Sequence, residues 1–229
     1  MSNYSQPTQR KRSPRGLGDQ LRDEILTAAR RLLAETGNVA GVSIRSVADL
    51  VGVSAPSIYR HFADKDALVD AVVSEVFTDL DNEMQRAASE AESAIDSLRA
   101  QGLAYVRFAR THPEQYRLAT MLASESRRSV DDVLGTTAFH HFLAGIEACI
   151  GEGLFLPGSD PVQLALELWA AAHGVAALMV AKPYLPWGDP DEFADRVLRA
   201  ACIGQAISDA LGEPEPREFV SWLQGQRGN

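Results

Sequence analysis

The chain is poor in cysteine, and its two cysteines form no motif. Cys149 and Cys202 both stand in apolar surroundings, and no C-x-x-C spacing occurs in the 229 residues. Metal sites and disulfide frameworks use clustered cysteines at short, regular spacings. We therefore expect both thiols to be buried and reduced, neither bridged nor metal-bound.

Long hydrophobic runs are also missing. The longest strongly apolar stretch, Leu164–Ala181, is interrupted by Glu167 and His173 and is followed closely by Lys182 and two prolines. This pattern predicts a buried helix rather than a membrane span. No apolar run follows the basic residues near the N-terminus, so this segment is unlike a secretory signal. We expect a cytoplasmic protein.

Motifs of the common catalytic sites are absent. The sequence contains no H-E-x-x-H, no G-x-S-x-G and no P-loop, and Gly16-Leu-Gly18 does not follow a strand. A di-iron centre in a helical bundle needs Glu-x-x-His, and no histidine here has a glutamate three residues before it. His140 and His141 are adjacent and point apart on a helix. We expect no enzyme activity, no catalytic residues, no metal and no cofactor.

Alternating apolar and polar residues, which indicate β-strands, are missing as well. Apolar residues recur instead at spacings of three and four, so the sequence predicts an all-α fold. Ser43 and Ser54 are suited to cap two short helices, and the carboxylate of Asp64 suits the N-cap of the helix that begins there. The other expected helices span 19–36, 95–112, 116–121, 129–150, 161–182, 190–211 and 219–223.

Charge is distributed unevenly along the chain. Residues 1–63 hold nine Lys/Arg and five Asp/Glu, whereas residues 64–229 hold thirteen Lys/Arg and twenty-six Asp/Glu. The net charge is therefore +4 in the first part and −13 in the second. Such asymmetry indicates a small basic module carried on an acidic body, and a basic module is typical of proteins that bind a polyanion.

The segment Ser43–Phe62 meets the physical demands of a helix-turn-helix. Two short helices are joined by a turn at Gly52, and Ala48 is small where the helices must cross closely. Val53 and Ile58 are placed to fill the small core. Small side chains then face outward from a helix slim enough to enter the major groove of DNA.

This segment and the following Ala63–Val69 closely resemble the DNA-binding domain of TetR-family transcriptional regulators, with an AcrR-like helix-turn-helix. The similarity covers approximately residues 19–75, and its most specific parts are Tyr59-Arg-His-Phe62 and Lys65-Asp-Ala-Leu68. The resemblance implies that double-stranded DNA is a partner.

The resemblance also implies roles for individual residues. Side chains at the start of the second helix would contact phosphate and a base, those of the third helix would face base edges, and the following polar side chains would bind phosphates. The candidate DNA-binding residues are Ser43, Arg45, Ser54, Ala55, Ser57, Tyr59, Arg60, His61 and Lys65. Arg60 is equally well read as a solvated surface residue, and Phe62 is better explained by core packing. The basic segment Arg10–Arg15 either contacts a neighbouring groove or phosphate of the DNA or serves solubility.

The C-terminal region resembles the family more weakly. Leu168–Val175 is similar to a Trp…His-Gly helix found in one subclass of C-terminal domains. This implies an effector pocket among the middle helices and a homodimer formed by the last two long helices. The small residues Gly174, Ala200, Ala201 and Gly204 would permit close helix approach in such a dimer.

Large side chains on the middle helices are candidate pocket residues, although ordinary core packing is the favoured explanation for any single one of them. They are Tyr105, Phe108, Tyr116, Met121, Phe142, Trp169 and His173. Trp169 and His173 share a helix face. A pocket of this composition favours a small apolar or aromatic ligand, which remains unidentified.

The sequence therefore predicts four parts: a basic flexible arm (1–18), a DNA-binding domain (19–68), an effector-binding and dimerisation domain (69–212) and a C-terminal tail (213–229). Together they indicate a homodimeric transcriptional regulator, a repressor that a ligand releases from a palindromic operator. The alternative is a small-molecule-binding helical protein that has lost DNA binding.

Overall fold

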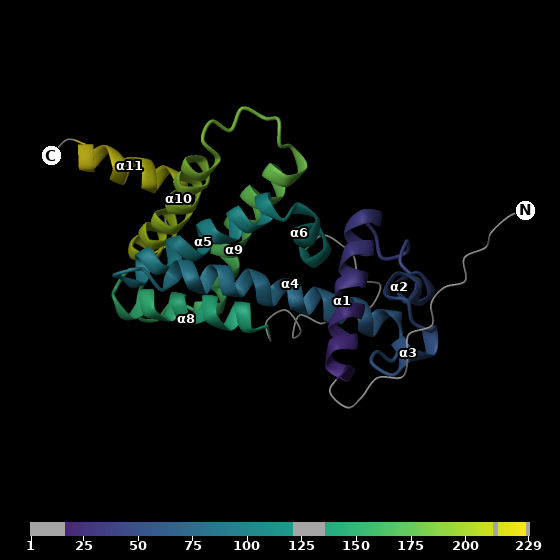
Figure 1. Ribbon diagram of the computed structural model, residues 1–229. Helices are drawn as coiled ribbons and strands as arrows, with labels where there is room; N and C mark the ends of the chain where they lie inside the picture. The colour runs from purple at the N-terminus through teal and green to yellow at the C-terminus, as the bar shows by residue number, and fades with distance from the viewer. Residues whose placement is uncertain (1–16, 121–135, 213–214, 228–229) are drawn as a thin grey trace, which may run out of the picture. The chain divides into compact units, whose positions relative to one another are not determined.

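The structure, a computed structural model, describes residues 17–120, 136–212 and 215–227 (Figure 1). Every regular element in these ranges is a helix, and they contain no strand, which confirms the predicted all-α fold. The described residues form two compact units, 17–79 with 112–120 and 80–111 with 136–212 and 215–227. We call the described parts of these units the head and the body.

The head contains α1 (Leu17–Thr36), α2 (Ile44–Val51), α3 (Ala55–Tyr59), the first part of α4 (Lys65–Ala88) and α6 (Pro113–Thr120). Arg30 on α1 forms an ion pair with Asp79 on α4 and donates a hydrogen bond of 3.1 Å to Gln115 on α6. The core consists of side chains with almost no exposed surface, and these are Ile25, Leu26, Leu33, Val47, Ile58, Phe62, Leu68, Val72 and Val76.

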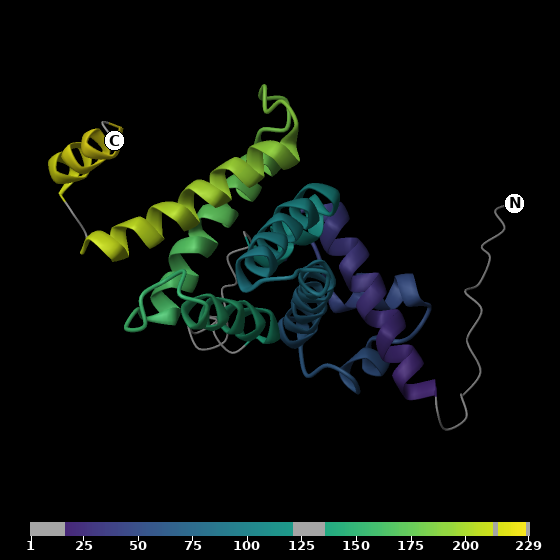
Figure 2. The same ribbon diagram turned by 90° about the vertical axis from the view of Figure 1, so that its left-hand side faces the viewer.

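The body contains the remainder of α4 from Leu80, together with α5 (Ala94–Thr111), α8 (Thr137–Gly151), α9 (Pro161–Ala181), α10 (Pro190–Leu211) and α11 (Pro216–Arg227). Helix α5 packs against α8, α9 and α10, and α9 also packs against α8 and α10 (Figure 2). The core between them includes Leu98, Phe139, Ile146, Phe155, Leu164 and Leu168.

Both cysteines belong to this core. They are free and buried, as the sequence predicts. Burial raises the pKa of the Cys149 thiol to about 12, and it also raises the pKa of Cys202. Both thiols therefore stay protonated at neutral pH and are poor nucleophiles.

Local signals set the ends of the two longest body helices. Asp160 accepts hydrogen bonds from the backbone N–H groups of Val162 and Gln163, and Asp189 caps α10 in the same way. Each aspartate is followed by a proline, which fits the first turn because the N–H groups there have no intrahelical acceptor. Gly212, with φ 70°, ends α10 in the left-handed conformation.

Ion pairs between side chains join α5 to α10. Arg99 donates a hydrogen bond of 2.5 Å to Asp195, and Asp191 accepts hydrogen bonds of 2.6 Å from both Arg107 and Arg110. Burial alone would raise the pKa of Asp191, but the hydrogen bonds and charges of the two arginines hold that pKa below its ordinary value. These pairs add polar contacts to an apolar interface.

Helix α9 is long and apolar enough to cross a membrane by length and composition. Eight of its side chains are buried against the rest of the body, among them Leu164, Leu168 and Val175. This burial is what the core helix of a bundle shows, in agreement with the interpretation from the sequence.

Helix α6 begins at Pro113, three residues before the predicted 116–121, and two other helices differ more from the sequence prediction. Helix α8 begins at Thr137, where the hydroxyl of Thr136 caps it, and the earlier part of the predicted 129–150 helix lies outside the described residues. The C-terminal helix spans Pro216–Arg227 and is longer than the predicted 219–223. Glu215 supplies its first backbone acceptors, a local signal that the apolar spacing did not reveal.

Candidate nucleic-acid interface

Helix α2 is held in place by bonds within its own segment. The Ser43 hydroxyl accepts a hydrogen bond from the Ser46 N–H, and the Ser46 hydroxyl accepts one from the Ser43 N–H, which makes a capping box. At the other end, Gly52 adopts φ 76°, a conformation that costs a residue with a side chain roughly 1–2 kcal/mol. Gly52 therefore allows the backbone conformation of the turn that leads to α3.

Helix α3 begins at Ala55, and Ser54 occupies its N-cap position. The Ser54 hydroxyl makes no capping bond, because it lies 2.9 Å from the Ser57 hydroxyl and pairs with it instead. The sequence predicts the position of this cap correctly but not its hydrogen bond. Ile58 is fully buried beneath α3, so the opposite side of this short helix faces outward.

Phe62 closes the core of the head, as predicted. Its side chain is 5% exposed, and the Arg22 guanidinium lies 5.4 Å from the centre of its ring. Such a cation–π contact covers the remaining ring surface. The packing explanation for Phe62 is sufficient without a role in binding.

The segment around α3 presents an exposed aromatic side chain. Tyr59 is 53% exposed, although aromatic side chains contribute most of their stabilising energy when they are buried. Arg45 and Arg60 are also exposed, whereas His61, Ala55 and Ser57 are half-buried. A hydroxyl, two guanidiniums and an imidazole are the donors that contact DNA phosphates, and small side chains let a helix approach base edges.

Lys65 is the first residue of α4. The carboxylate of Asp64 accepts a hydrogen bond of 2.8 Å from the Ala67 N–H, so Asp64 caps this helix as predicted. The Lys65 ammonium thus stands next to a helix N-terminus, whose partial positive charge adds to its own. Helix N-termini of this kind bind phosphate groups.

The positively charged side chains of this surface differ from others of the head in their ion pairs. Arg30 is paired with Asp79, and Arg31 donates a hydrogen bond of 2.7 Å to Glu35. Within the described residues, Arg45, Arg60 and Lys65 form no ion pair. The nine candidate DNA-binding residues lie on α2, on α3, at the start of α4 and at positions directly beside α2 and α3, and the basic arm lies outside the described residues.

Three of the candidate pocket residues form a polar cluster in the body. The Tyr105 hydroxyl lies 3.0 Å from Nδ1 of His173, and Trp169 donates a hydrogen bond of 3.3 Å from Nε1 to the same hydroxyl. The rings of Trp169 and His173 make an edge contact, as expected for two residues that share a helix face, and a joint role in ligand binding stays a prediction. Burial lowers the pKa of His173, which keeps its imidazole neutral at neutral pH.

The other described candidate pocket residues are divided between the head and the body. Phe108 and Tyr116 are 1% exposed, and Tyr116 belongs to the head, whereas Phe108 belongs to the body. Met121 lies outside the described residues. Among the described candidates, Phe142 alone lines the cavity found in the body, and a ligand role for each candidate stays a prediction.

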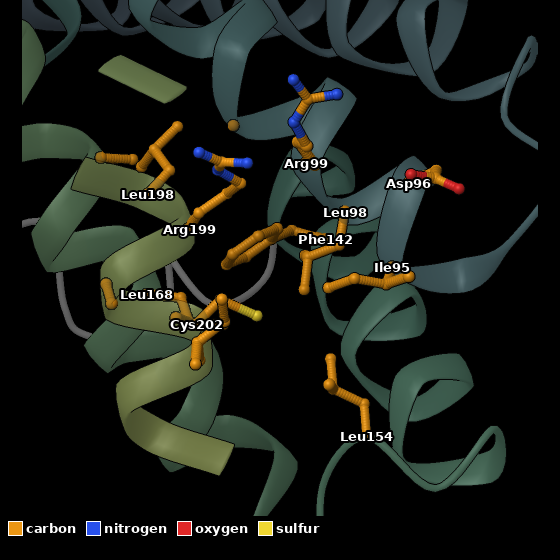
Figure 3. Close-up of a pocket in the computed structure, with 14 residues that line it drawn as sticks. Ile95, Asp96, Leu98, Arg99, Phe142, Leu154, Leu168, Leu198, Arg199 and Cys202 are labelled. Atoms are coloured by element: carbon orange, nitrogen blue, oxygen red, sulfur yellow. The ribbon is translucent and has the colours of Figure 1, made fainter. Parts of the chain in front are cut away.

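The cavity has a volume of about 430 Å³ and is bordered by α5, α8, α9 and α10 (Figure 3). Sequence reasoning missed most of its lining, which includes Ile95, Leu98, Arg99, Leu198, Arg199 and Cys202. Gly102 and Ala172 also line it, and small residues on facing helices were the available signal. Their spacing alone does not show whether a neighbouring side chain fills the gap.

The head thus has the geometry of a helix-turn-helix domain, joined to a larger helical domain. Residues 25–72 match the family model described as bacterial regulatory proteins, tetR family, and residues 98–201 match that of the tetracyclin repressor-like C-terminal domain. The chain belongs to the TetR family of transcriptional regulators.

Individual relatives support this assignment over different lengths. The chain is 33% identical over 89 residues to the HTH-type transcriptional regulator EthR of Mycolicibacterium smegmatis, a match that spans 37% of this chain and 41% of EthR. It is 27% identical over 180 residues to the HTH-type regulator Rv0681 of Mycobacterium tuberculosis, spanning 79% of both chains. A solved structure from Rhodococcus sp. RHA1, a protein with unknown function, has 30% identity and a TM-score of 0.66 over 81% of this chain and 95% of that chain.

Proposed function

We propose that the protein is a cytoplasmic, homodimeric, DNA-binding transcriptional repressor that a small ligand releases from a palindromic operator. The observation that carries this proposal is the surface of α2, α3 and the start of α4. There, Tyr59, Arg45, Arg60 and Lys65 are exposed or half-exposed and form no ion pair within the described residues. Membership of a family of transcriptional regulators supports it.

Each head would place α3 in a major groove. Ala55 and Ser57 would face base edges, while Tyr59, His61 and Lys65 would bind phosphates and fix the register. The hydroxyls of Ser43 and Ser54 already bond within the head, so their contribution to DNA binding would require these bonds to be shared or exchanged. Arg45 and Arg60 reach outward and add sequence-independent affinity.

The dimer would form through α9 and α10. Leu166 and Leu178 on α9 and Ile203 on α10 are exposed apolar side chains. A Cβ atom added at Gly174 or Gly204 would meet nothing within 4 Å in this chain, so packing inside the chain does not explain either glycine. Close approach by a second copy would use both features.

Release by a ligand would be a shift between two populations, and its size would equal the ligand's differential affinity for them. Helix α4 offers a physical connection, because Lys65 begins it and Asp81 lies on its portion in the body. Nδ1 of His141 on α8 lies 3.0 Å from both carboxylate oxygens of the buried Asp81. The neighbouring Phe142 lines the cavity, so a ligand there would contact the helix that holds α4.

The direct test is fluorescence anisotropy of the purified protein with a duplex from its own upstream intergenic region, titrated at two salt concentrations beside a scrambled duplex. The proposal predicts tight, salt-sensitive binding that prefers the native duplex. Equal, weak binding to both duplexes, followed by the absence of enriched sites in genome-wide binding, would contradict it and favour a helical small-molecule-binding protein.

A charge-neutralised variant locates the interface. Lys65→Gln should weaken binding to all duplexes and reduce the dependence of log K on log salt by about 1 for each lysine that contacts a phosphate. Lys182→Gln removes the same charge from an exposed position in the body and is the matched control. If both variants bind DNA like the wild type, the assignment of Lys65 is wrong.

A further inference from the structure

The cavity in the body has two chemically different ends. Figure 3 shows the guanidiniums of Arg99 and Arg199 together at one end, with Leu154 at the opposite end and Ile95, Leu98 and Phe142 between them. Apart from Asp96 and the two arginines, the side chains that line the cavity are aliphatic or aromatic, or belong to Cys202. A ligand that fills it must therefore be apolar over most of its length.

Arg99 and Arg199 differ in their interactions with Asp195. Asp195 lies between them, and its Oδ1 accepts a hydrogen bond of 2.5 Å from Arg99. Nε of Arg199 lies 3.4 Å from the other carboxylate oxygen, and the Arg199 guanidinium donates no hydrogen bond within the described part of the chain. Since a guanidinium carries five N–H donors, Arg199 has unused donors at the mouth of the cavity.

The nearby carboxylates of Asp195 and Asp96 accept no hydrogen bond from Arg199 within the described residues. Asp195 stays ionised because the hydrogen bond and charge of Arg99, together with the charge of Arg199, lower its pKa. Asp96, which also lines the cavity, accepts a hydrogen bond of 2.6 Å from the Ser93 hydroxyl at the start of α5. An incoming acidic group would find Arg199 less engaged than Arg99.

We propose that this cavity binds an amphipathic monoanion, a molecule whose apolar body fills the space between α5, α8, α9 and α10 and whose single acidic group pairs with Arg199. The inference rests on the proposed function, because it names the class and the site of the ligand that would release the repressor. It places the ligand away from the Tyr105–Trp169–His173 cluster, whose polar atoms already bond to one another.

The cavity borders on the proposed dimer surface along α10. Ala200 and Gly204 are exposed on α10 and do not line the cavity, whereas Arg199 and Cys202 do. Among the described exposed large apolar residues of α10, Ile203 alone belongs both to the cavity lining and to the proposed dimer surface. Ligand binding and dimer formation would therefore use neighbouring side chains of the same helix, with Ala201 and Ile203 shared between the two surfaces.

Isothermal titration calorimetry of the full chain with sodium decanoate, beside uncharged 1-decanol, tests the proposal. Decanoate should bind about tenfold more tightly than decanol, because only its charged carboxylate forms a charge-assisted bond with a guanidinium. Arg199→Gln should remove this preference, and Arg196→Gln, an exposed arginine of the same helix outside the lining, should keep it. Equal affinities for decanoate and decanol, or the same effect of both substitutions, would overturn the assignment of the acidic group.

A second pair of variants tests the location. Ile95→Trp enlarges a side chain that projects into the cavity from a partly exposed position and should abolish decanoate binding (Figure 3). Leu156→Trp makes a comparable change at an exposed position outside the lining and should leave binding unchanged. Decanoate that binds Ile95→Trp like the wild type, or fails to bind the wild type, would refute the site.

These titrations contain no DNA, so their outcome is independent of the anisotropy experiment. Failure of decanoate binding with intact operator binding would refute only the cavity proposal. Decanoate binding without any operator binding would instead refute the proposed repressor function and keep the ligand site.

Discussion

The head and the body place their proposed binding residues in different ways. In the head, a capping box at Ser43, a left-handed glycine at Gly52 and a carboxylate cap at Asp64 fix three successive segments within a short stretch of chain. In the body, the cavity exists only because helices distant in sequence leave space between their side chains. Local signals therefore specify the head, and long-range packing specifies the body.

The variants with the largest expected effect on stability each shorten one buried isoleucine, one in the head and one in the body. Ile58 and Ile146 are both fully buried, so replacing either by alanine should lower the free energy of unfolding by about 2–5 kcal/mol. Because the head has the smaller core, Ile58→Ala should abolish duplex binding while decanoate still binds. Denaturant unfolding, combined with both binding assays, measures these effects.

Ile146→Ala is the reciprocal variant, since Ile146 lies in the core that borders the cavity. It should weaken decanoate binding more than it weakens binding to duplex DNA under conditions where the protein remains folded. Parallel loss of both activities in both variants would show that the head and the body do not behave as separate units.

A smaller effect concerns the ion pairs of the body. Asp191→Asn removes the carboxylate shared by Arg107 and Arg110 and should cost about 0.2–1 kcal/mol, because these side chains are substantially exposed. The folded-state pKa of Asp191 lies below its ordinary value of 3.8, so this contribution is present above that pH and is lost as the pH falls through the folded-state pKa.

Denaturant unfolding of wild type and Asp191→Asn at neutral pH and in acid measures this contribution. The difference between them should shrink in acid. Asp49→Asn removes an exposed carboxylate of the head and should show no comparable difference at either pH. A stability gap for Asp191→Asn that stays constant down to strongly acidic pH would contradict the ion-pair explanation.

The same contrast explains how much the sequence could predict. The starts of α2 and α4 follow from Ser43 and Asp64, and the bounds of α9 and α10 follow from an aspartate, a proline and a terminal glycine or lysine. The family resemblance supplied the candidate DNA-binding residues, which periodicity alone did not distinguish from other exposed side chains.

The cavity could not be predicted in this way. Large aromatic residues such as Phe108 and Tyr105 suggested a pocket, but they fill space and are buried. The cavity is lined by leucines, isoleucines, two arginines and a few small residues, among them Gly102, where an added Cβ would lie 3.1 Å from a methyl carbon of Leu198. Whether such positions are filled depends on side-chain packing between α5 and α10, which hydrophobic spacing does not encode.

Selection of binding sites from a random duplex library tests most directly the central claim that α3 reads DNA as one of a symmetric pair. Wild-type protein should enrich an inverted repeat whose half-site centres lie about 34–36 Å apart or at a multiple of that spacing. Lys65→Gln should enrich the same repeat with lower affinity, because phosphate contacts carry no sequence information. A library that yields no enriched sequence, or a motif without two-fold symmetry, would contradict the account.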